Sequence, residues 1–148
     1  MLVFVDTGLL LSCFDDEDTA RRDRARDWVG QCWQRRCGRL STQVLNEFYS
    51  SARRHFPQAI TAGDARAEVR RYQHWKPWSI DHPTVETAWA VESRYGVNYW
   101  DALIVAAAQQ QGCELLLSEA LPHEQRYESV QVINPFTVGP ERLDQSPA

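Results

Sequence analysis

The sequence lacks the long hydrophobic runs, repeats and leader segments by which several classes of protein are recognised. No stretch approaches the roughly 20 apolar residues of a membrane-spanning helix, so we expect no membrane association. The opening apolar run of residues 2–5 is too short and too uncharged for a signal peptide, which favours a cytoplasmic location. Repeats and low-complexity tracts are also absent. A chain of 148 residues with 43% hydrophobic content fits a single globular domain.

The four cysteines form no recognisable disulfide or zinc pattern. Only Cys32 and Cys37 are close in sequence, and no histidine stands at zinc-finger spacing. A Cys–His or Ser–His–Asp catalytic set is not apparent either. We therefore expect four reduced thiols without a catalytic role.

Lysine is nearly absent, and basic charge is unevenly distributed. The net charge of −4 gives no overall attraction to nucleic acid. Residues 21–76 nevertheless contain thirteen of the 16 basic residues and five of the 20 acids, and every one of these basic residues except Lys76 is arginine. Because arginine suits bidentate contacts to phosphate, the pattern fits a basic rim around an acidic centre as well as ordinary solvated helix faces.

Short apolar runs alternate with helical patterns along the chain. The patterns predict strands at about 2–6, 39–41, 78–80, 114–118 and 130–133, and helices at about 9–14, 19–36, 42–55, 61–75, 83–95 and 99–111. Such alternation predicts an α/β fold with a mostly parallel sheet between two helical layers. We expect one domain at residues 1–136 and a flexible C-terminal tail at residues 137–148.

Several residues mark helix ends or helix interiors. Ser41 or Thr42 is expected to cap the helix at 42–55, Gly96 to end the helix at 83–95, and Asn98 to cap the helix that follows. The helical spacing of Trp28, Trp33 and Trp89 predicts that these side chains pack inside the protein, whereas Tyr99 and Trp100 either pack or border a site.

Three acids that are far apart in sequence stand at strand ends or helix starts. Asp6 ends the first strand, Glu47 interrupts the apolar face of its helix, and Asp101 precedes the apolar run of residues 102–108. Ligands of open α/β sheets bind at the carboxyl ends of the strands, where such positions gather. Carboxylates gathered there repel one another, raise at least one pKa, and suit a divalent cation beside a phosphate substrate.

Each of these residues also has a structural interpretation. Asp6 can cap the helix after it, Glu47 can turn to solvent, and Asp101 can complement a helix dipole. Ser118, at the end of the predicted strand 114–118, either reaches the carboxylates or caps the loop that follows. A shared site explains all three acids more economically than three separate structural roles that converge by chance.

Four segments of the chain resemble the PIN-domain nucleases, particularly the VapC-type toxins of bacterial toxin–antitoxin pairs. They are VFVDTGLLL near the start, STQVLNEFYSS, YWDALIVAAA, and LLLSE followed by VINPF. The resemblance implies a three-layer α/β/α sandwich and hydrolysis of RNA phosphodiesters with Mg²⁺ or Mn²⁺ held by Asp6, Glu47 and Asp101. It also implies an antitoxin partner and a homodimer, with the Arg-rich segment 42–75 contacting the antitoxin or a second copy. From the sequence alone, this segment could equally face RNA.

One departure from the family pattern lies after the strand 114–118. Relatives usually carry a fourth acid there, but this chain has Ala120, which cannot coordinate a metal ion. Glu119 is an additional candidate metal ligand, and Glu124 is a less defined one. His123 is either a general acid, a ligand or a loop residue without a role.

Three functions therefore stay open at the level of sequence. The first is a metal-dependent endoribonuclease with Asp6, Glu47, Asp101 and Ser118 in its site. The alternative is a catalytically weakened PIN domain that binds RNA or a protein without efficient cleavage. A phosphohydrolase with Asp6 as nucleophile is disfavoured, because that chemistry needs a second acid where the chain has Gly8.

Overall fold

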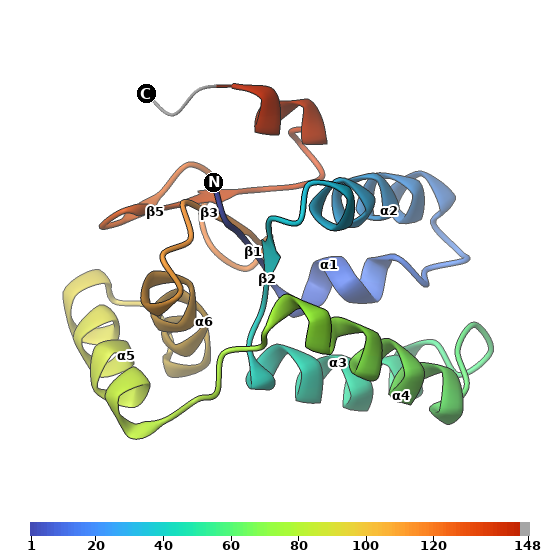
Figure 1. Cartoon of the computed structure of the whole chain (residues 1–148), viewed down its shortest axis with the longest axis horizontal. Helices are drawn as coiled ribbons and strands as arrows, with labels where there is room; N and C mark the ends of the chain where they lie inside the picture. The colour runs from blue at the N-terminus through green and yellow to red at the C-terminus, as the bar shows by residue number, and fades with distance from the viewer. Residues whose placement is uncertain (146–148) are drawn as a thin grey trace.

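The fold is a five-stranded sheet covered by helices, seen in a computed structural model that describes residues 1–145 (Figure 1). In chain order the elements are β1 (Val3–Val5), α1 (Thr7–Ser12), α2 (Thr19–Gln34), β2 (Gly38–Arg39), α3 (Thr42–His55), α4 (Ala62–Arg71), the 3₁₀ helix η1 (Tyr72–Trp75), α5 (His82–Tyr95), α6 (Tyr99–Gln110), β3 (Leu115–Leu117), β4 (Arg126–Tyr127), β5 (Val130–Ile133) and the 3₁₀ helix η2 (Pro140–Asp144).

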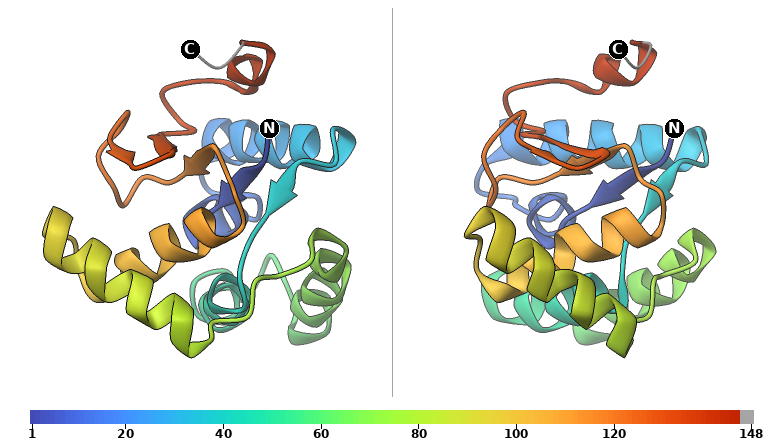
Figure 2. Two further views of the ribbon diagram at one scale, coloured as in Figure 1. Left: turned by 60° about the vertical axis from the view of Figure 1, so that its left-hand side comes forward. Right: turned by 90° about the vertical axis from the view of Figure 1, so that its left-hand side faces the viewer.

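The strands are arranged in the order β2-β1-β3-β5-β4. All pairings are parallel except that of β4 with β5. Helix α2 lies on one side of the sheet, and α3, α5 and α6 lie on the other (Figure 2). The predicted α/β fold with a mostly parallel sheet between helical layers is confirmed. Because the chain adds β2 on one side of β1 and β3 on the other, the sheet has a topological switch point between β1 and β3.

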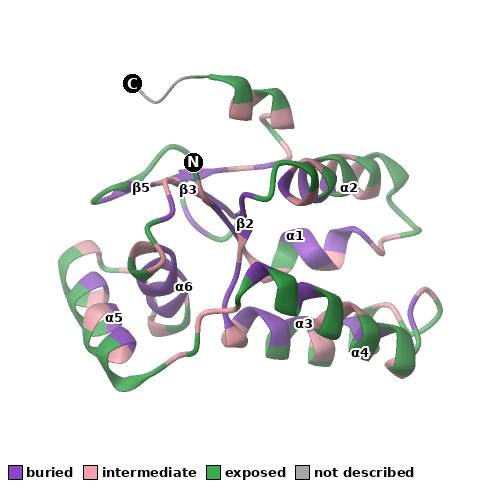
Figure 3. Cartoon of the chain, in the orientation of Figure 1, coloured by how far each residue is buried: buried purple, intermediate pink, exposed green. Residues whose placement is uncertain are grey.

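The core is centred on the short strands and on helix α6 (Figure 3). All three residues of β1 are fully buried, and every residue from 102 to 108 in α6 is buried. A helix that is apolar on all sides must be covered on all sides, and α6 lies between the sheet and α5. This buried helix fixes the position of its first turn, which contains Asp101.

The predicted helix caps are confirmed. Ser41 caps α3 by accepting a hydrogen bond from the backbone N–H of Val44. Gly96 ends α5 in the left-handed conformation with φ of 69°, and Asn98 caps α6. The four cysteines are free and buried.

Some predicted elements were wrong. The predicted strand 78–80 is only an isolated bridge between Ser41 and Trp78, too short to extend the sheet. The predicted helix 61–75 is two elements, because α4 tightens into η1 at Tyr72. Trp89 was expected inside, but it is 46% exposed and packs edge-on against His82 at the surface. The two-residue strand β4 was not predicted, because so short a segment has no periodicity.

The C-terminal segment contains the second 3₁₀ helix. Trp28 donates hydrogen bonds from Nε1 to the carbonyl oxygens of Pro135 and Val138, both at 3.0 Å, so α2 anchors the start of this segment. The division into a domain at 1–136 and a flexible tail at 137–148 stays a prediction, and residues 146–148 lie outside the described part. Over residues 1–145, no helix combines the length and the hydropathy needed to span a bilayer.

Candidate active site

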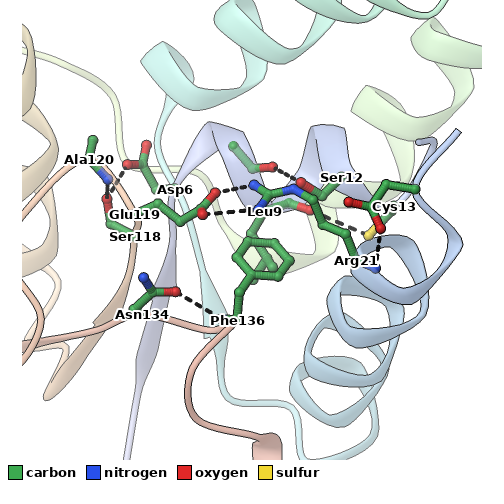
Figure 4. A network of polar contacts seen from close by, with 12 residues as sticks. Asp6, Leu9, Ser12, Cys13, Arg21, Ser118, Glu119, Ala120, Asn134 and Phe136 are labelled. Carbon is green, nitrogen blue, oxygen red and sulfur yellow. Dashed lines mark hydrogen bonds and ion pairs between the residues drawn. The ribbon is translucent and has the colours of Figure 1, made fainter.

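Two predicted site residues meet at the switch point of the sheet. Asp6 directly follows β1, and Ser118 directly follows the neighbouring strand β3. The hydroxyl of Ser118 donates a hydrogen bond to Oδ2 of Asp6 at 2.7 Å (Figure 4). Ser118 Oγ also accepts a hydrogen bond from the backbone N–H of Ala120 at 3.1 Å. Ser118 is buried, and it fills both of the roles that the sequence left open. It contacts a carboxylate, and it holds the loop that follows β3.

Thr7 connects Asp6 with Glu47. Its backbone N–H donates to Oδ1 of Asp6 at 2.7 Å, so Asp6 is the N-cap of α1. Its hydroxyl donates to Oε1 of Glu47 at 3.1 Å. This role of Thr7 was not predicted. The signal was a hydroxyl residue directly after an acid at a strand end, but its contact with α3 depends on the packing of α1 against α3.

Asp101 is held by its own helix cap. Nδ2 of Asn98 donates to Oδ2 of Asp101 at 2.6 Å, and Oδ1 of Asn98 accepts a hydrogen bond from the backbone N–H of Asp101 at 3.0 Å. The carboxylate of Asp101 is therefore engaged at the N-terminus of α6. It is still close enough to Asp6 and Glu47 for its negative charge to raise the pKa of both.

The pKa of Asp6 lies above its ordinary value. Burial is the main cause, because it removes the water that stabilises the charged form. The hydrogen bonds from Ser118 and Thr7 lower the pKa and offset part of this effect, while the charge of Asp101 raises it. The predicted rise is confirmed, but burial contributes more to it than the repulsion between acids on which the prediction rested.

The pKa of Glu47 is also raised. The residue as a whole is exposed, yet partial burial of the carboxylate is the largest cause. The hydrogen bond from Thr7 lowers this pKa, and the charge of Asp6 raises it. Neither an arginine nor a lysine is among the main causes for Asp6 or Glu47. The two acids therefore share a region of negative potential in which a cation would be stabilised.

The fit to a divalent metal ion is good in donor type but not in arrangement. Carboxylate oxygens suit Mg²⁺ and Mn²⁺. Within residues 1–145, however, no three His, Cys, Asp or Glu side chains are gathered closely enough to hold a metal ion. The carboxylates of Glu47 and Asp101 instead accept hydrogen bonds from Thr7 and Asn98. The metal-binding role of Asp6, Glu47 and Asp101 thus stays a prediction.

The other candidates near β3 make different contacts. Both carboxylate oxygens of Glu119 accept hydrogen bonds from Arg21 on α2, whose guanidinium lies 3.8 Å from the centre of the Phe136 ring (Figure 4). His123 accepts a hydrogen bond at Nδ1 from the backbone N–H of Asn134 at 2.9 Å, which is a structural role. Ala120 contributes only its backbone N–H to the site.

Comparisons with known proteins agree with the observed fold. A model of the PIN-domain family matches residues 3–119, most of the chain. The crystal structure of VapC20 from Mycobacterium tuberculosis, described as a sarcin–ricin loop cleaving toxin, has a TM-score of 0.59 to this chain. The two are 22% identical over 77% of this chain and 86% of that one, so the likeness concerns the fold. No curated protein matches the chain.

Proposed function

Because the chain belongs to the PIN-domain family of nucleases, we propose that it is a divalent-metal-dependent endoribonuclease. The observation that supports this most is the pair of acids Asp6 and Glu47 at the switch point. Both have raised pKa values, chiefly from burial, with no cationic side chain among the main causes. Keeping these acids ionised without a cationic partner destabilises the fold, and such destabilisation is expected where an acid binds a ligand rather than supporting the fold.

In this proposal, Asp6, Glu47 and Asp101 hold Mg²⁺ or Mn²⁺, and Glu119 is a further candidate that must first leave Arg21. The bound cation would activate water for attack on phosphorus and neutralise the charge that develops on the leaving oxygen. Ser118 and Thr7 orient the two oxygens of Asp6 through hydrogen bonds. Thr7 also fixes Glu47 relative to Asp6.

Metal dependence tests the proposal directly. The purified protein is expected to cut a pool of structured and unstructured RNA with Mg²⁺ or Mn²⁺, to lose this activity in EDTA, and to regain it when the metal is restored. Gel electrophoresis of end-labelled RNA is the readout. Equal cleavage in EDTA would exclude the mechanism.

Ser118→Ala is expected to shift the pH dependence of cleavage. Removing the hydroxyl deletes a hydrogen bond that lowers the pKa of Asp6, so this pKa rises further. Cleavage needs ionised Asp6 and is lost as the pH falls through the pKa of Asp6. The acidic limb of kcat/KM against pH should therefore move to higher pH, and activity should recover at alkaline pH. Ser118→Thr keeps a hydroxyl and serves as the control. A uniform loss at every pH would assign Ser118 a role in folding only.

The biological setting that fits this proposal is a toxin–antitoxin pair. VapC20 shares the fold and is described as a toxin that cleaves the sarcin–ricin loop. By this analogy we propose that the chain is a VapC-type toxin that acts on RNA, pairs with an antitoxin protein and forms a homodimer. Reading the adjacent gene tests the antitoxin, and sedimentation of the purified chain tests the dimer.

A second candidate is a PIN domain that binds RNA without cutting it. The ion pair between Glu119 and Arg21, together with Ala120, favours this candidate, because it leaves the side of the site next to β3 without a free acid. RNA binding without any metal-stimulated cleavage would support it over the nuclease.

A further inference from the structure

A cavity opens beside Glu47, between the first turns of α3 and α6. Its volume is about 540 Å³, and Gln43, Asn46, Glu47, Trp100 and Leu103 line it. We refer to it as the Trp100 pocket. It is much larger than a metal site requires, and it shares Glu47 with the group of acids. A ligand in this pocket therefore lies next to the proposed reaction centre.

The most exposed large apolar side chain in the described chain lines this pocket. Trp100 is 64% exposed, although its neighbours from Ala102 onward are buried. Nε2 of Gln43 donates to the carbonyl oxygen of Trp100 at 3.2 Å, and this bond fixes the start of α6 against α3. Tyr99 meets the indole edge-on, with 5.2 Å between ring centres. The backbone at Trp100 is thus fixed against α3, while the indole contacts Tyr99 and stays open to a flat partner.

A second, Arg-bearing pocket adjoins the first. Asn46 borders both pockets, and the second, of about 290 Å³, is also lined by Tyr49, Arg66 and Arg70. Nε of Arg66 donates to the hydroxyl of Tyr49 at 3.2 Å, which orients the guanidinium on this face. An aromatic surface beside arginines is the combination that single-stranded nucleic acids bind, since bases stack and phosphates pair with the cations.

We propose that the Trp100 pocket binds an unpaired nucleobase of the RNA substrate, stacked on the indole of Trp100, while Arg66 and Arg70 contact the adjoining phosphates. The occupant is RNA rather than a second copy of the chain, because the pocket adjoins both the acids of the reaction centre and the arginines. The inference rests on the proposed function, since it assigns the substrate to the same site. It makes Trp100 a determinant of preference for single-stranded RNA.

Binding to a variant that cannot cut tests the pocket separately from catalysis. In an Asp6→Asn background, the affinity for a fluorescein-labelled single-stranded RNA of about ten nucleotides is measured by anisotropy. Adding Trp100→Ala is expected to raise Kd roughly tenfold or more, because stacking of one base is lost. Trp100→Phe keeps an aromatic face and should retain most of the affinity. Trp89→Ala removes another exposed indole, on α5, and should leave Kd unchanged. The same RNA annealed to its complement should bind less tightly and be insensitive to Trp100→Ala.

Each outcome decides one question. Equal Kd values for Trp100→Ala and Trp100→Phe would overturn the nucleobase pocket. The pocket would also be overturned if Trp100→Ala abolished self-association in sedimentation and left the Kd for RNA unchanged. In the cleaving protein, Trp100→Ala should raise KM more than it lowers kcat. RNA binding that depends on Trp100 in a wild-type chain that cuts no RNA would refute the nuclease and leave the pocket standing.

Discussion

Asp6→Asn is expected to reduce RNA cleavage by on the order of 100-fold or more while raising the melting temperature of the protein in EDTA. Asparagine keeps one acceptor oxygen for the backbone N–H of Thr7, and its amide N–H can donate to the hydroxyl oxygen of Ser118 in place of the bond that Asp6 accepts there. It loses the negative charge that would hold the cation. The gain in stability follows from the raised pKa. Burial makes the folded state bind a proton more tightly, so the contribution of Asp6 to stability is lost as the pH rises through its folded-state pKa. At neutral pH, removing the charge therefore stabilises the fold.

Asp101→Asn should lower cleavage similarly, and Asp27→Asn provides a matched control. Asp27 is exposed on α2, on the opposite side of the sheet from α6, and its replacement should change neither activity nor melting temperature. The readouts are initial rates of RNA cleavage in Mg²⁺ and thermal unfolding in EDTA. An Asp6→Asn variant with full activity and a lower melting temperature would identify Asp6 as a helix cap only.

Trp28→Ala is expected to lower the free energy of unfolding by about 3–5 kcal/mol. Trp28 is fully buried in α2, and its indole N–H binds the carbonyl oxygens of Pro135 and Val138. Truncation leaves a cavity and removes the donor shared by both carbonyls. Small domains have a free energy of unfolding of about 5–15 kcal/mol, so this single substitution removes a large part of it.

The exposed Trp89 supplies the comparison for this experiment. Trp89→Ala removes the same side chain from a position that is 46% exposed, and the expected change is within about 0.5 kcal/mol. Urea unfolding followed by circular dichroism gives both values. Equal losses for the two variants would show that α2 does not hold the segment after β5 as the structure indicates.

Much of the fold and the neighbourhood of the site could be predicted from the sequence. The end of the first apolar run placed Asp6, and the end of a later run placed Ser118, because strands buried on both faces give continuous apolar stretches. The parallel order then brings both residues to one edge of the sheet. The fully apolar run from 102 to 108 likewise located α6, and with it Asp101.

The orientation of the polar side chains could not be predicted in this way. Asp101 accepts a hydrogen bond from Asn98, and Glu119 pairs with Arg21, a residue 98 positions earlier in the chain. These contacts depend on rotamers and on the packing of distant helices, which hydrophobic periodicity does not encode. Trp89 was misplaced for a related reason. A helical spacing identifies a face, but α5 buries only part of that face against α6.

Anomalous diffraction from a crystal soaked in Mn²⁺ tests the central claim most directly, namely that these distant carboxylates together hold a divalent cation. The expected result is a peak whose ligands include an oxygen of Asp6, at about 2.1 Å, together with Glu47 or Asp101. A saturated soak without a peak at the switch point, or with Mn²⁺ bound only elsewhere on the surface, would contradict it.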